Sequence, residues 1–213
     1  MKVALKRQVK ESNILSAAEK VFFSRGFSQA KMEEVAEACG LSKPTLYFYF
    51  KSKEDLYMAI TYRAFQALID LYYDIIDRHK EKNGRDRVIH ILEGYLDFSE
   101  KNHDYHEALF NYMGLVRTGT KENGMVRSVY FKKIQGIHNL PIDIVVQEIA
   151  AGQVDGSIKN KKEPEMIYLT AWALIAGYIK LNVFSGTARG TLHHVSLKDW
   201  RNYVIQLSKE LLN

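Results

Sequence analysis

The stretch LSKPTLYFYFKSKEDL, residues 41–56, places lysine, threonine and tyrosine side chains close together. Ammonium groups and hydroxyls of these types are the groups with which proteins bind the phosphate oxygens of nucleic acids. The aromatic run within the stretch also favours a β-strand. The chemistry therefore depends on which element presents these side chains.

The residues around the run favour a helix. Two residues separate it from the preceding apolar segment and one from the next capping serine, which is too little room for a strand. Ser42 can cap a helix, and Pro44 fits the first turn, where its missing N–H is not needed. In a helix, Leu46 and Phe50 form an i, i+4 pair that faces the core. The polar and aromatic residues between them then lie on an exposed face.

A short helix over Met32–Cys39, a turn at Gly40 and this second helix have the spacing of a helix-turn-helix. In that motif the second helix is held at a fixed angle and can enter the major groove of DNA. The alternative is a helical hairpin with incidental surface aromatics.

The charge distribution agrees with a polyanionic partner. Residues 1–53 carry ten Lys and Arg against five Asp and Glu, a net charge of +5, and the remaining 160 residues are neutral overall. A basic module on a neutral body is typical of nucleic-acid binding. A solvated face without a partner is the alternative.

The rest of the chain predicts an all-α fold, because it has only three prolines and helical apolar periodicity nearly throughout. A long helix from Ser52 to Arg78 spans about 40 Å. Together with the two short helices above, the predicted helices cover residues 6–25, 52–78, 85–102, 104–117, 125–155, 164–184 and 196–212.

Residues 14–56 resemble the N-terminal domain of the TetR/AcrR family of bacterial transcription regulators. The resemblance rests on the Gly-aromatic pair at 26–27, the turn glycine, "PTLYFYF" and "KSKEDL". It implies a three-helix DNA-binding domain over residues 1–52 and a helical effector-binding and dimerisation domain over residues 53–213. The implied function is that of a homodimeric regulator, most often a repressor, released from a pseudo-palindromic operator by a small, mostly apolar effector.

The resemblance also implies DNA contacts. Thr45, Tyr47, Tyr49 and Lys53 would hold phosphates, and Ser42, which caps the same helix, belongs to the expected DNA-binding set. Lys43 and Phe48 would lie nearest the base edges. Lys31 stands where the family usually has threonine, and it is either a substitute phosphate contact or a lysine that points to solvent.

The C-terminal part carries the other implied sites. A dimer stripe at 3, 4, 3, 4 spacing comprises Leu197, Trp200, Val204, Leu207 and Leu211. The expected effector pocket comprises Phe98, His103, Phe110, Tyr112, Met113, Tyr130 and Trp172, although each could also be an ordinary core residue.

The competing class is an α-helical enzyme or metal-binding bundle with an incidental basic hairpin. Glu100 and His103 form one Glu-x-x-His element, but di-iron bundles require two. We therefore expect no enzyme activity, catalytic residues, metal or cofactor.

The apolar residues 166–184 raise the possibility of a membrane span. Lys180, Asn182 and the absence of flanking basic asymmetry favour a buried helix instead. A single cysteine, and a basic start with no apolar run of signal-peptide length behind it, predict a cytoplasmic protein.

Overall fold

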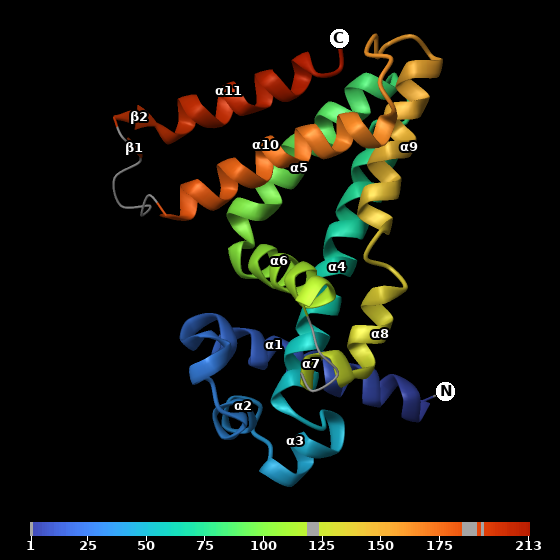
Figure 1. The fold of residues 1–213 in the computed structure, drawn as a ribbon. Helices are drawn as coiled ribbons and strands as arrows, with labels where there is room; N and C mark the ends of the chain where they lie inside the picture. The colour runs from blue at the N-terminus through green and yellow to red at the C-terminus, as the bar shows by residue number, and fades with distance from the viewer. Residues whose placement is uncertain (1, 119–123, 185–190, 193) are drawn as a thin grey trace. The chain divides into compact units, whose positions relative to one another are not determined.

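The computed structural model describes residues 2–118, 124–184, 191–192 and 194–213, and most of these residues are helical (Figure 1). The all-α prediction is confirmed. The helices are α1 (Lys2–Gln29), α2 (Met32–Ala38), α3 (Lys43–Tyr49), α4 (Lys53–Arg78), α5 (Gly84–Lys101), α6 (His103–Thr118), α7 (Gly124–Arg127), α8 (Val129–Gln135), α9 (Leu140–Val154), α10 (Pro164–Phe184) and α11 (Leu197–Glu210). Two short strands, β1 (Thr191–Leu192) and β2 (Val195–Ser196), pair antiparallel and were not predicted.

The chain forms two compact units. The first comprises residues 1–66 and 104–138, and the second comprises residues 67–103 and 139–213. The first therefore contains α1 to α3, the start of α4, and α6 to α8. The predicted boundary between residues 52 and 53 separates a DNA-binding domain from an effector-binding and dimerisation domain. This functional division stays a prediction.

Glycines end the first two helical segments of the first unit. Gly26 interrupts α1 with φ 76° and ψ 154°, a combination that essentially only glycine adopts, so the backbone there is extended rather than left-handed helical. Gly40 follows α2 with φ 61°. Its N–H donates to Glu37 O (3.0 Å), and the N–H of Leu41 donates to Ala36 O (2.9 Å). These paired bonds form a Schellman motif, which sets the direction of the chain into α3.

The predicted helix over residues 125–155 is wrong as a single element, because the structure divides it into α7, α8 and α9. Ser128 has an extended backbone, and its hydroxyl accepts the N–H of Tyr130, so a new helix begins there. Pro141 lies in the first turn of α9, where it cannot continue a preceding helix. Both signals are present in the sequence.

In the second unit α9 packs against α5 and α10, and α10 also packs against α11 (Figure 1). The contact of α5 with α9 is close at Gly84 and Gly152, because a Cβ atom at Gly84 would overlap the backbone of Gly152. None of the helices in the described ranges is sufficiently long and apolar to span a membrane.

Candidate functional site

The first turn of α3 is held by its own polar residues. Ser42 lies at the N-cap, and its hydroxyl accepts the N–H of Thr45 at 3.3 Å. The hydroxyls of Ser42 and Thr45 also share a hydrogen bond of 2.7 Å. Lys43 forms an ion pair with Glu33 of α2, and this contact raises the pKa of Lys43 and lowers that of Glu33. Lys43 is therefore paired with Glu33 in the free protein.

The two faces of α3 differ as predicted. Leu46 and Phe50 are completely buried in the core of the first unit. Phe48 is 63% exposed, and its ring meets that of Tyr49 edge to face at a centroid distance of 5.4 Å. Tyr47 is half-buried, with the Lys43 ammonium 6.0 Å from its ring centroid. The exposed face thus presents hydroxyls, one ammonium group and one apolar ring.

Lys53, the first residue of α4, is tied to the end of α1. Its ammonium donates to Ser28 O at 3.1 Å and lies 4.6 Å from the ring centroid of Phe27. Lys31 is exposed at the N-cap of α2, and its backbone N–H donates to the Glu34 carboxylate at 3.0 Å. The structure therefore brings the residues from 42 to 49 together on one helix and places Lys31 and Lys53 at the starts of two others. Their contacts with DNA stay predictions.

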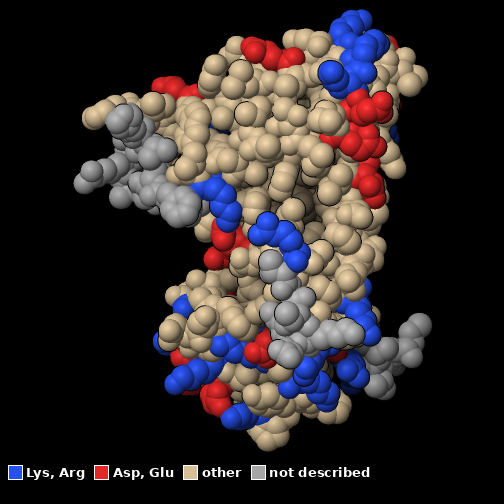
Figure 2. All heavy atoms as spheres, viewed as in Figure 1, with Lys and Arg blue, Asp and Glu red and all other residues tan. Residues whose placement is uncertain are grey.

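Basic residues concentrate in the first unit. It carries 16 Lys and Arg against 10 Asp and Glu, a net charge of +6, whereas the second unit carries 14 against 15, a net charge of −1. Figure 2 shows Lys and Arg side chains spread over the visible face of the first unit. Such a surface attracts a polyanion.

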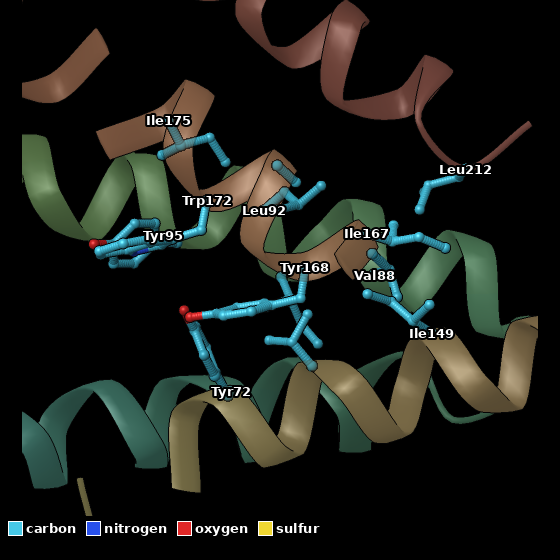
Figure 3. A pocket seen from close by; sticks show the side chains of 13 residues that line it. Tyr72, Val88, Leu92, Tyr95, Ile149, Ile167, Tyr168, Trp172, Ile175 and Leu212 are labelled. Carbon is cyan, nitrogen blue, oxygen red and sulfur yellow. The ribbon is translucent and has the colours of Figure 1, made fainter. Parts of the chain in front are cut away.

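The second unit holds an apolar cavity lined by residues of α4, α5, α9 and α10 and by Leu212 beyond α11 (Figure 3). Its free volume is about 20 Å³, which is room for roughly one water molecule. Tyr72 and Tyr168 extend toward one another across it, and Trp172 lies beside Tyr95 (Figure 3). No Asp, Glu, Lys, Arg or His lines it within the described ranges.

The tyrosines of this cavity stay neutral at ordinary pH. Burial raises the pKa of Tyr95 to about 12, against a smaller lowering by its hydrogen bond with Trp172. Burial likewise raises the pKa values of Tyr72 and Tyr168. The cavity therefore offers apolar walls with a few neutral hydroxyls, which suits a mostly apolar molecule.

Of the predicted pocket residues, only Trp172 lines this cavity. Phe98 is buried in the second unit and lines a different surface hollow, and His103 is half-buried at the start of α6. The other four lie in the first unit: Phe110, Tyr112, Met113 and Tyr130.

Those four side chains also have different surroundings. Phe110 is half-buried beside His106, with a centroid distance of 4.6 Å, whereas Met113 is exposed. Tyr112 is buried against Phe65 at 5.4 Å between ring centroids.

Phe98, His103 and Trp172 thus lie in the second unit and the other four in the first. That the set lines one effector pocket stays a prediction. Tyr72 and Tyr168 were not predicted, because only the folded chain brings them to the same cavity.

The predicted dimer stripe of α11 is partly used inside the protomer. Val204 is only 5% exposed, and Trp200 meets Tyr178 of α10 edge to face at 5.0 Å between centroids. Leu197, Leu207 and Leu211 are half-buried. Val204 therefore packs inside the protomer, and the role of this stripe in a dimer interface stays a prediction.

The residue types of a metal site do not gather in the described ranges: no group of three or more His, Cys, Asp or Glu could hold an ion there. Glu100 of the single Glu-x-x-His element instead accepts hydrogen bonds from Tyr178 and Arg201, each at 3.2 Å.

Comparison with known proteins identifies similar regulators. Residues 14–60 match the family described as "Bacterial regulatory proteins, tetR family". The chain is 32% identical over 106 residues to the transcriptional activator FasR of Mycolicibacterium smegmatis, an alignment that covers 50% of this chain and 48% of FasR. The chain thus spans about half the length of that relative.

Two further similarities extend over most of the chain. The fatty acid metabolism regulator protein of Bacillus subtilis is 21% identical over 175 residues, which are 79% of this chain and 86% of that protein. The crystal structure of the transcriptional regulator FadR from Bacillus subtilis, in complex with stearoyl-CoA, superposes with a TM-score of 0.66 at 19% identity and covers 95% of this chain and 97% of that one. The latter similarity concerns the fold alone. Residues 14–60, which include the helix-turn-helix, are thus similar to the TetR family of bacterial regulatory proteins.

Proposed function

We propose that this protein is a transcription regulator that binds a pseudo-palindromic operator as a homodimer and responds to a small ligand. The observation that carries the proposal is α3, whose buried face is fixed by Leu46 and Phe50 and whose exposed face carries Lys43, Tyr47 and Phe48. This helix follows a Schellman turn in the more basic of the two units. We assign DNA binding to residues 1–52, and ligand binding and dimerisation to residues 53–213.

Selection of bound duplexes from a random DNA pool tests the DNA-binding proposal. We expect an enriched pair of inverted half-sites with centres spaced by about one helical turn or a multiple of it. The matched control is the variant Tyr47→Phe/Phe48→Ala, which changes only exposed or half-buried residues of α3 and should lose the enrichment. A wild-type pool without any enriched sequence would contradict the proposal.

Homodimerisation is supported by an exposed apolar face on α10. Its residues follow helical spacing: Met166, Leu169, Ala173, Gly177 and Leu181. A glycine inside a helix costs about 1 kcal/mol relative to alanine. Among the described atoms, none lies within 4 Å of a Cβ atom placed at Gly177, so the protomer does not require glycine there. Close packing of a second copy against α10 would explain why this position lacks a side chain.

For the ligand we propose a mostly apolar molecule, of which a long acyl chain is the best candidate. The support is the apolar cavity beside Tyr72 and Trp172, together with a fold shared with a regulator crystallised with stearoyl-CoA. Because the free volume is about 20 Å³, a ligand must select a conformation in which the surrounding helices are further apart. Tyr72 lies on α4, whose first residues belong to the DNA-binding unit. A shift of this helix would change the separation of the two recognition helices of the dimer.

We propose repression as the sign of regulation, in the cytoplasm. The relative FasR is described as an activator, so activation is the second candidate. Transcription in vitro from a promoter that carries the selected operator distinguishes the two. Repression predicts less transcript with protein and recovery with ligand, whereas activation predicts more transcript with protein.

A further inference from the structure

A groove in the first unit is lined in part by α3, the proposed recognition helix. Arg7 of α1, Phe48 of α3, Lys51 before α4 and Lys133 of α8 line it. The basic residues of the N-terminal segment, Arg7 and Lys51, therefore lie in the same groove as Lys133, which is far from them in the sequence. Residues 124–138 contain three Lys and Arg and no Asp or Glu.

Aromatic rings hold the three cations in place. The Lys133 ammonium lies 4.6 Å from the ring centroid of Tyr130 and 5.7 Å from that of Tyr62. Arg7 and Lys51 each lie 5.9 Å from the ring centroid of Phe48. Cation–π contacts restrict where these side chains point, so the groove presents positioned charges.

The acidic residues of the groove are already engaged. Glu11 binds the Arg7 guanidinium at 2.8 Å, and Asp55 accepts the hydroxyl of Ser128 at 2.5 Å. In the part of the chain that the structure describes, neither Lys51 nor Lys133 takes part in an ion pair. Two of its cations thus remain available for an anion.

We propose that Lys133, together with Lys51, binds a backbone phosphate of the operator in addition to the phosphates bound by α3 and Lys53. The inference rests on the proposed DNA-binding function. Duplex DNA carries one negative charge per about 1.7 Å of its axis. A duplex that lies against the exposed ring of Phe48 therefore presents further phosphates to the groove, because Phe48 also lines this groove. Lys133 lies on α8, far beyond the helix-turn-helix in the sequence. The proposed DNA-binding surface therefore includes a residue from outside that motif.

Phosphate neutralisation tests this contact. Methylphosphonates are placed one at a time along the selected operator, and the affinities of the wild type and of Lys133→Ala are measured for each duplex. We expect Lys133→Ala to bind the unmodified operator several-fold more weakly and to lower the salt slope by about one. A methylphosphonate at one position should lower the operator affinity of the wild type several-fold and leave that of Lys133→Ala unchanged. This position should differ from the positions at which a methylphosphonate has no effect on Tyr47→Phe.

Lys132→Ala is the matched control, because Lys132 is an exposed neighbour on the same helix that does not line the groove. We expect it to bind every duplex as the wild type does. The inference is overturned if Lys133→Ala binds like the wild type, or if its loss adds to that of every methylphosphonate. A wild type that binds no DNA sequence would instead contradict the proposed function.

Discussion

At the scale of single residues, the ion pair with Glu33 engages the ammonium group of Lys43 in the free protein. Both side chains are more than half exposed, and in the proposed complex the Glu33 carboxylate would repel a phosphate bound by Lys43. We predict that Glu33→Gln strengthens operator binding by about two- to fivefold at low salt, because exposed ion pairs are weak. Fluorescence anisotropy with labelled operator measures the change. Glu37→Gln, an equal change of charge on the same helix, should have the smaller effect, and weaker binding by Glu33→Gln would contradict this role.

Tyr95, one of the tyrosines that line the cavity, makes the free energy of unfolding depend on pH. Tyr95 has its folded-state pKa raised to about 12 by burial, above the ordinary value near 10. Its contribution is therefore fully present below pH 10 and is lost as the pH rises toward 12. At pH 11 the wild type should have lost about 1.4 kcal/mol of unfolding free energy that Tyr95→Phe retains.

Denaturant unfolding at pH 9 and pH 11 measures this difference. Tyr73→Phe, at an exposed tyrosine of α4, should behave like the wild type. Equal alkaline losses in the wild type and in Tyr95→Phe would show that Tyr95 ionises as freely in the folded protein as in the unfolded chain.

At the scale of elements, the contact of α5 with α9 depends on the absence of a side chain. A Cβ atom at Gly84 would overlap the backbone of Gly152, which cannot move aside as a flexible side chain can. Gly84→Ala should therefore destabilise the protein by about 1 to 3 kcal/mol. Gly114→Ala on α6, where an added Cβ atom would have no atom of the described residues within 4 Å, should stabilise it by about 0.5 to 1 kcal/mol. Thermal unfolding followed by circular dichroism measures both, and a stabilising Gly84→Ala would contradict the close contact.

The same scale explains how far the sequence predicts this fold. The helix-turn-helix could be predicted because its signals are local: the Ser42 cap, Pro44 and Gly40 each act within a few residues. The break at Ser128 was missed because the apolar periodicity of residues 125–155 outweighed one capping serine. The cavity could not be predicted, since Tyr72 and Tyr168 are almost a hundred positions apart in the chain and only packing brings them together. Lys133 was missed for the same reason.

At the scale of the whole molecule, a substitution on the exposed face of α10 tests whether the protein is a dimer. Leu169 is 53% exposed in the protomer, so Leu169→Glu should leave folding intact but place a charge in the proposed interface. Sedimentation should show monomers with wild-type helix content, and operator affinity should collapse because each half-site then binds alone. Val154→Glu, at an 89% exposed residue of α9, is the control and should remain a dimer. A dimeric Leu169→Glu would mean that the interface lies elsewhere.

The coupling of ligand to DNA requires two sites that influence each other reciprocally. Trp172 lines the cavity, whereas Trp200 lies against Tyr178, and the chain has no other tryptophan. A Trp200→Phe variant therefore retains a single tryptophan, Trp172, at the proposed ligand site. Acetyl-CoA shares the head group of stearoyl-CoA without the long chain, so it serves as the control compound.

The most direct measurement titrates stearoyl-CoA into Trp200→Phe with and without saturating operator and follows the emission of Trp172. We predict an emission change with stearoyl-CoA but not with acetyl-CoA. The affinity for stearoyl-CoA should be lower in the presence of operator, by the factor through which the ligand lowers operator affinity, typically about 5- to 150-fold. Emission that does not change on binding, or equal ligand affinity with and without operator, would contradict a regulator whose cavity controls its hold on DNA.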